Sequence, residues 1–98
     1  MVIENILPIG TVVELNNIDA RLIIAGYCAQ SENNPDYTWD YSAFVFPIGY
    51  SGVDNVISFD SDQIKNIIAY GYQDDEQLSY MKELEKIIAS IDKSGKEK

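Results

Sequence analysis

The residues of this chain that could do chemistry are mainly its acids, because the sequence contains no histidine and a single cysteine, Cys28. A histidine-based catalytic triad, a histidine metal site and a histidine pH switch are therefore excluded, as are an internal disulfide and a CxxC site. Asp54 and Asp60 are candidates for an acid–base pair of the glycosidase type, but nothing in the sequence fixes their separation. The chain is also short for a catalytic cleft, so we expect no enzyme activity.

The other polar clusters have simpler structural interpretations. Asp74-Asp75-Glu76 lacks the interleaved spacing and the glycine turn of a calcium loop, and is typical of the N-terminus of a helix. Ser42 and Ser58 have no histidine or suitably placed lysine beside them to act as a base. The segment Gly49–Gly52 contains no lysine and fits no phosphate-binding loop. We therefore expect no metal and no cofactor.

The aromatic residues are more informative than the acids. Strand-like alternation places Tyr37, Trp39 and Tyr41 on one face, where they form either part of the core or an exposed binding face. Tyrosine and tryptophan are enriched at protein interfaces because they combine apolar area with a polar group. The same two interpretations hold for Tyr70 and Tyr72. The candidate partner-binding residues are Tyr37, Trp39, Tyr41, Tyr70 and Tyr72.

The charge balance limits the partners of the chain. Its 98 residues contain 7 basic and 16 acidic side chains, a net charge of −9, and Arg21 is the only base in the first 60 positions. Such a chain repels nucleic-acid phosphates and anionic lipid, so the charge favours a cationic protein partner or simple solubility. No segment has the ~20 apolar residues needed to span a bilayer. The first residues have no signal-peptide pattern, so we predict a cytoplasmic location.

β-Branched and aromatic residues, separated by turn residues, predict four strands in the first 60 positions. Turn residues at Asn16–Asp19 predict that the first two strands form an antiparallel hairpin. The second strand is apolar on both faces, which is typical of a central strand. Polar residues predict a loop at Ser31–Asp36, and Pro47 ends the third strand. The predicted strands are Thr11–Leu15, Arg21 to about Cys28, Tyr37–Phe46 and Val56–Phe59.

The stretch Ile64–Tyr72 is ambiguous between helix and strand. Asp60 and Gln63 have the spacing of a capping box and indicate a helix start. Helical spacing of the isoleucines competes with a run of residues that favour strands. We favour one helical turn to about Asn66, followed by a short strand to Tyr72.

The clearest predicted element is a helix from Asp75 to about Ile91. Acids at its start and Lys93 just past its end complement the helix dipole. Its apolar stripe packs on the domain's own sheet or docks on a partner. The residues of the stripe are Leu78, Met81, Leu84, Ile88 and Ile91.

These elements predict an α+β fold in a single domain over residues 1–92, with a frayed tail at 93–98. The expected architecture is a four- to five-stranded, mainly antiparallel, curved sheet with a C-terminal helix. A small barrel-like closure is an alternative, because the strands are short and separated by glycine and proline.

The order of several motifs resembles a small bacterial family of unknown function, numbered 4176 among such domains. The resemblance covers roughly residues 6 to 90. Its most specific pieces are the opening LPIGTVV and the Ile-Ile-x-Gly-Tyr pattern of the second strand. The segments that carry it are Leu7–Leu15, Leu22–Tyr27, Tyr37–Pro47, Phe59–Ile64 and Gly71-Tyr72.

Members of that family tend to be encoded beside LXG-type toxins that Gram-positive bacteria export by type VII secretion. The resemblance therefore implies a non-catalytic protein that binds such a toxin in the cytoplasm, as a chaperone or targeting accessory. It implies no catalytic residues. An immunity protein that blocks a basic toxin is the main alternative, because the negative charge would steer association with such a target. A small enzyme that uses acidic residues is a further alternative.

Overall fold

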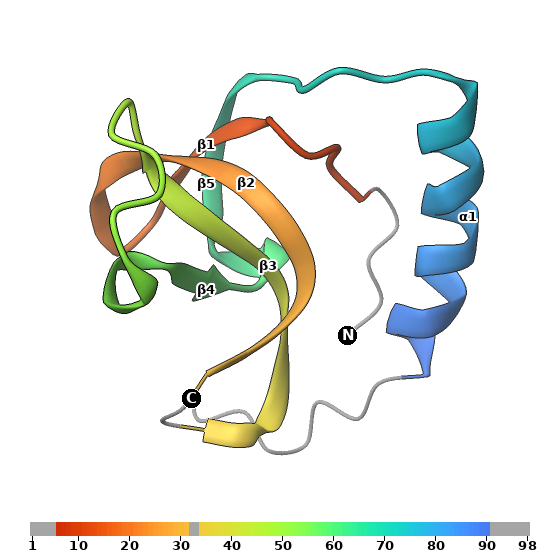
Figure 1. Cartoon of the computed structure of the whole chain (residues 1–98), viewed down its shortest axis with the longest axis horizontal. Helices are drawn as coiled ribbons and strands as arrows, with labels where there is room; N and C mark the ends of the chain where they lie inside the picture. The colour runs from red at the N-terminus through yellow and green to blue at the C-terminus, as the bar shows by residue number, and fades with distance from the viewer. Residues whose placement is uncertain (1–5, 32–33, 91–98) are drawn as a thin grey trace.

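The computed structural model of the chain describes residues 6–31 and 34–90. Within these residues, one antiparallel sheet with strand order β4-β3-β2-β1-β5 stands beside one α-helix, α1 (Figure 1). This confirms the predicted α+β fold; the sheet is curved but not closed into a barrel. The strands are β1 (Val12–Leu15), β2 (Ile18–Ser31), β3 (Asn34–Phe46), β4 (Ile57–Phe59) and β5 (Ile64–Ala69), and the helices are η1 (Val53–Asn55), η2 (Ser61–Gln63) and α1 (Asp75–Ala89).

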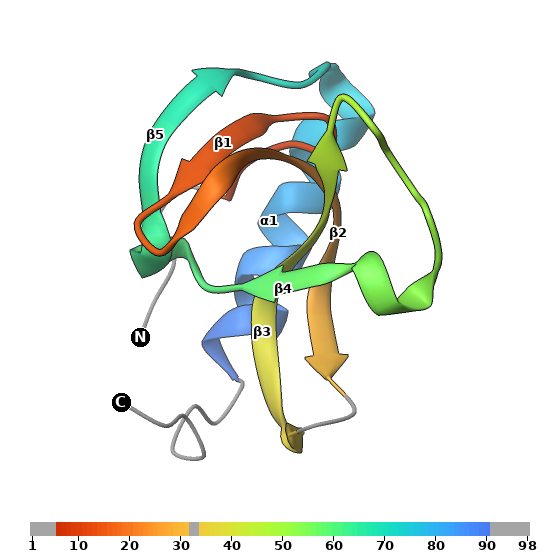
Figure 2. The same cartoon turned by 90° about the vertical axis from the view of Figure 1, so that its left-hand side faces the viewer.

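The sheet is curled because its two edge strands are almost consecutive in the sequence. β4 ends at Phe59 and β5 begins at Ile64, yet they occupy opposite edges. The edges of a flat five-stranded sheet lie about 19 Å apart. A chain step of this length spans about 17 Å even when fully extended, and η2 shortens it further. The sheet must therefore bend until its edges approach, as Figure 2 shows.

The bend is located in the long central strands. The pairing of β2 with β3 shifts register between Ile24 and Gly26, and Cys28 has a positive φ of 56°. A Cβ at position 26 would lie 2.9 Å from the hydroxyl oxygen of Ser42, so glycine permits the close approach of the two strands. β2 is the middle strand of the sheet, which confirms its prediction as a central strand.

A segment that we call the strap, residues 6–10, passes between the sheet and α1 (Figure 1). Leu7 is buried in the sheet core, whereas Ile6 packs against both the sheet core and the helix cluster. The backbone N–H of Gly10 donates to the carbonyl of Ile24 over 2.8 Å, which joins the strap to β2. The buried sheet core consists of Leu7, Val13, Leu15, Leu22, Ile24, Tyr41, Ala43 and Phe59.

Helix α1 packs on the strap and on β2 through part of its apolar stripe. Its N-cap is Asp74, whose side chain accepts a hydrogen bond from the backbone N–H of Gln77 over 2.8 Å. Leu78 stays 48 % exposed although it belongs to the predicted stripe. Ile91 and the predicted tail at 93–98 lie outside the described residues. The buried helix residues Met81, Leu84 and Ile88 pack against Ile6, Tyr27 and Cys28.

Several predicted element boundaries were wrong. The helical turn is η2, before Ile64, and β5 ends at Ala69, so the predicted turn to Asn66 and strand to Tyr72 are both displaced. The reason is that the capping box of Asp60 is complete within three residues, after which Ile64 pairs with Leu15 of β1. The predicted loop at Ser31–Asp36 is also wrong, because β2 reaches Ser31 and β3 begins at Asn34.

Candidate binding surfaces

The aromatic face predicted on β3 belongs to the interior of the fold. Tyr37 and Tyr41 are each only 1 % exposed, and Trp39 is partly buried. Tyr37 and Trp39 pack edge to face with ring centroids 4.7 Å apart, and Tyr41 stacks on Phe59 at 5.3 Å. Of the two interpretations given for this face, the structure therefore has Tyr37 and Tyr41 in the core, because the curled sheet buries both side chains.

A buried carboxylate links β3 to η2. Asp60 accepts hydrogen bonds from the hydroxyl of Tyr37 and from the backbone N–H of Asp40, the latter over 2.9 Å. Asp40 in turn accepts from the backbone N–H of Ser61 over 2.9 Å. Both acids are almost fully buried, at 2 % exposure or less. These contacts indicate that the two carboxylates have a structural role.

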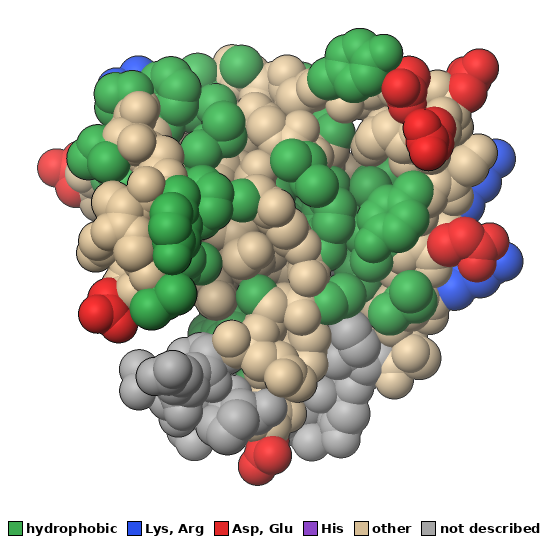
Figure 3. All heavy atoms as spheres, in the orientation of Figure 1, with side chains coloured by type: hydrophobic (Ala, Val, Ile, Leu, Met, Phe, Trp, Pro, Cys, Tyr) green, Lys and Arg blue, Asp and Glu red, His purple; other side chains and the backbone are tan. Residues whose placement is uncertain are grey.

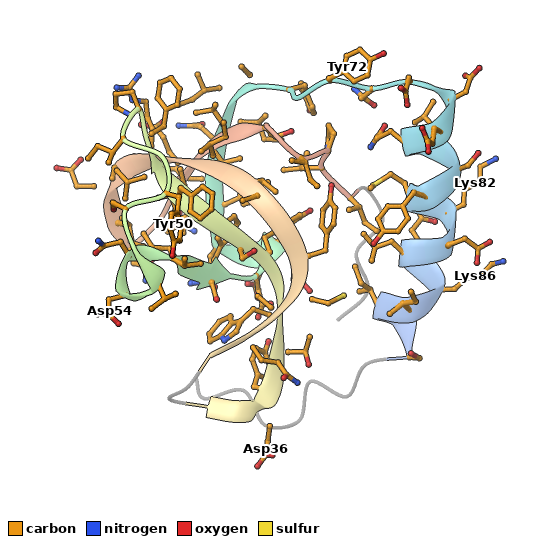
Figure 4. The ribbon with its side chains drawn as sticks, in the orientation of Figure 1. Asp36, Tyr50, Asp54, Tyr72, Lys82 and Lys86 are labelled. Carbon is orange, nitrogen blue, oxygen red and sulfur yellow. The ribbon has the colours of Figure 1, made fainter. Side chains whose placement is uncertain are left out.

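The acid–base pair considered for Asp54 and Asp60 does not form. Asp54 lies in η1, is exposed and projects away from the sheet (Figure 4), whereas Asp60 is fully buried. Across residues 6–31 and 34–90, no three cysteine, aspartate or glutamate side chains gather closely enough to hold a metal ion.

Three partly or fully buried tyrosines should make the folded state less stable at alkaline pH. Burial raises the pKa of Tyr27 to about 12 and raises the pKa of Tyr41 above its ordinary value. Burial, followed by the hydrogen bond to Asp60, also raises the pKa of Tyr37. Above pH ~10 the unfolded chain loses these protons and the folded chain keeps them, so the free energy of unfolding should fall by up to about 1.4 kcal/mol per pH unit for each tyrosine.

Urea unfolding at a series of pH values from 8 to 11 measures this loss. Absorbance at 295 nm gives the matching titration of the native chain, in which Tyr27, Tyr37 and Tyr41 should ionise above the ordinary range for tyrosine. Ionisation of all tyrosines in one step near pH 10, with constant stability, would contradict the prediction.

A groove of about 800 Å³, the β5–α1 groove, lies between the edge strand and the helix. Its floor is the strap from Ile6 to Pro8, and Ile67, Tyr70 and Leu78 line its sides. These three side chains are 40 %, 64 % and 48 % exposed, so apolar surface faces solvent on both sides of the groove. The outer edge of β5 pairs with no other strand of the described sheet. The groove and the free strand edge together form a surface suited to protein binding.

A second hollow, the aromatic–acidic pocket, has a volume of about 500 Å³ and lies against α1 on another side of the strap. Tyr72 is 77 % exposed and projects from the connection between β5 and α1 (Figure 4). Tyr27 and Tyr80 have ring centroids 6.5 Å apart. Figure 3 shows hydrophobic side chains between the sheet and α1, with acidic side chains beside the upper end of the helix. The pocket is lined by Ile9, Tyr27, Tyr72, Asp74, Glu76, Gln77, Tyr80 and Met81.

Two of the predicted partner-binding residues, Tyr70 and Tyr72, lie in different hollows. Tyr70 lines the groove and Tyr72 lines the pocket, so both remain candidates for partner contact. Sequence reasoning missed Tyr27 and Tyr80, because one lies within a central strand and the other lies beside the apolar stripe of the helix. The i, i+4 spacing of Glu76 and Tyr80 on one helix face was the signal available in the sequence.

Comparison with known proteins identifies the family. One family model, described as a domain of unknown function (DUF4176), matches residues 6–80, which include the strap, all five described strands and the start of α1. Neither the curated proteins nor the solved structures gave a significant match. No helix in the described part of the chain is long and apolar enough to cross a membrane. The match spans most of the chain, which therefore belongs to the DUF4176 family.

Proposed function

We propose that this chain is a non-catalytic binding protein that holds a segment of a protein partner in the β5–α1 groove. The observation that carries the proposal is the exposed apolar rim of the groove, formed by Ile67, Tyr70 and Leu78 around about 800 Å³. An extended segment could pair with the free edge of β5 and place alternate side chains in the groove. The hydrophobic area buried in this way would supply most of the affinity.

The resemblance to LXG-associated proteins suggests which partner this is. We propose an LXG-type toxin of type VII secretion, bound in the cytoplasm before export by this chain as a chaperone or targeting accessory. An open groove and an unpaired edge strand are suited to holding an extended segment of a larger protein.

The experiment is co-expression with the LXG toxin encoded beside the gene, followed by measurement of the dissociation constant by calorimetry. Replacing Ile67 with lysine places a charge at the apolar rim and should weaken binding about tenfold or more. The matched control is Ile48→Lys, since Ile48 is also exposed, at 69 %, but does not line the groove. No complex at micromolar concentration would reject the proposed partner, and an affinity that Ile67→Lys leaves unchanged, or that Ile48→Lys lowers as much, would reject the groove.

The second candidate function is that of an immunity protein, favoured by the net charge of −9. An acidic protein associates rapidly with a basic toxin and can cover its active site. The two functions differ in the activity of the bound toxin. A chaperone leaves the toxin active once it is bound or released, whereas an immunity protein in excess abolishes toxin activity in an assay with purified components.

A further inference from the structure

We infer that the aromatic–acidic pocket receives the cationic side chain of a lysine or arginine from the bound partner. This inference rests on the proposed function, because it assumes a protein partner, and it adds the chemistry by which one partner residue is recognised. The pocket differs from the β5–α1 groove in most of its lining residues, although the two hollows adjoin and share Gln77 and Met81.

The side chains of the pocket have the composition of a cation site. Three tyrosines line it, and tyrosine rings attract an ammonium or guanidinium group placed over their faces. Two carboxylates, Asp74 and Glu76, supply negative charge, and the described residues of the lining include no lysine or arginine. Ile9 and Met81 provide apolar surface for the methylene stem of a long basic side chain.

The positive end of the α1 dipole lies at the first turn and opposes the attraction of a cation. Its partial charge must therefore be compared with the negative charge of the two carboxylates. A helix N-terminus is equivalent to about +0.5 charge, and one oxygen of Asp74 already accepts the N–H of Gln77. The carboxylates of Asp74 and Glu76 still leave a local charge of about −1.5. The pocket therefore favours a cation over a neutral group of the same shape.

The pocket lining also contains a hydrogen-bond acceptor that an N–H donor of the ligand could satisfy. The side-chain oxygen of Gln77 is buried and has no hydrogen-bond partner within the described structure. Gln77 lines both hollows, so a group that enters either of them reaches this buried oxygen once the Gln77 side chain turns toward it. A lysine or arginine carries several N–H donors and no acceptor, and can satisfy this oxygen while its charge faces the carboxylates.

Binding of small side-chain analogues tests the inference without the toxin. Amide shifts in NMR spectra would be followed while n-butylammonium, n-butylguanidinium or neutral n-pentanol is added to the full chain. We expect the two cations to shift residues 72–81 in a saturable manner, with dissociation constants on the order of millimolar. n-Pentanol should bind at least about fivefold more weakly, and added salt should weaken only the cations.

Three variants and one matched control locate the site. Asp74→Asn keeps a good N-cap residue, and Asp74→Asn or Glu76→Gln should each weaken cation binding about three- to tenfold. Tyr80→Leu keeps apolar bulk and removes a ring, and should weaken the cations but not n-pentanol. Glu83→Gln removes the same charge from an exposed position of α1 outside the pocket, and should have little effect.

Two results would overturn the inference: equal binding of n-pentanol and the cations, or unchanged cation affinity in both carboxylate variants. Either result leaves the β5–α1 groove and the toxin experiment unaffected. Conversely, cation binding in the absence of a toxin complex would reject the proposed partner and retain the pocket. The failures of the two ideas are therefore distinguishable.

Discussion

Replacing Gly71 with alanine is expected to lower the free energy of unfolding by about 3 kcal/mol, since overfilling a packed site without room to relax is among the larger single-residue effects. A Cβ at this position would lie 2.1 Å from the carbonyl oxygen of Ile9, a backbone atom that cannot turn aside. The strap would have to move, although Leu7 fixes it in the core and its carbonyl accepts the hydroxyl of Tyr27 over 2.6 Å. Urea denaturation monitored by tryptophan fluorescence measures the change.

The matched control for this substitution is Gly49→Ala. Gly49 has a positive φ of 79°, but a Cβ there would meet nothing within 4 Å. Its replacement should therefore show only the conformational cost of a left-handed residue, about 1 kcal/mol. If Gly71→Ala is no more destabilising than Gly49→Ala, the strap is not held against residue 71 as described.

Replacing Asp60 with alanine is expected to cost about 3–5 kcal/mol of stability, because it removes the central acceptor of a buried hydrogen-bond network and leaves more than one buried donor without it. The hydroxyl of Tyr37 and the backbone N–H of Asp40 would both lose this acceptor in the interior. The capping box that starts η2 would be lost as well, and with it the tight connection from β4 to β5. Thermal and urea unfolding give the size of the loss.

A double-mutant cycle with Tyr37→Phe separates the network from simple loss of packing. In the native background Tyr37→Phe removes one donor to the buried carboxylate and should cost about 1–2 kcal/mol. In the Asp60→Ala background the same change removes a hydroxyl that has lost its acceptor, and should cost little or be favourable. Additive effects of the two substitutions would show that the two groups are not energetically coupled.

Much of the fold could be predicted from the sequence, because local patterns determine it. The apolar periodicity and acidic start place the helix at Asp75, and two-sided apolarity identifies β2 as the middle strand. The capping box of Asp60 and Gln63 was also recognised, although the turn that it starts is shorter than predicted. Patterns of this kind depend on residues only a few positions apart.

The candidate binding surfaces were harder to predict because they depend on long-range placement. Period-2 alternation puts Tyr37 and Tyr41 on one face of β3, but the curl of the sheet decides whether that face is covered. Asp40, on the opposite face, is buried as well, because Asp60 and Ser61 come from the turn that closes over β3. The strap, which lies between the two hollows, is neither helix nor strand. Its apolar residues therefore follow no helical or strand periodicity from which its position could be predicted.

The pairing of β1 with β5 has a consequence for the synthesis of the protein. β1 and β2 are joined by a tight turn and can pair within microseconds of leaving the ribosome. The other edge of β1 is covered only after β5 ends at Ala69, and translation from β1 to that point takes about 3–10 s. During this interval the nascent chain exposes an unpaired strand edge beside Val13 and Leu15, which favours aggregation. Completion of the sheet is therefore paced by translation of β5 rather than by formation of the first hairpin.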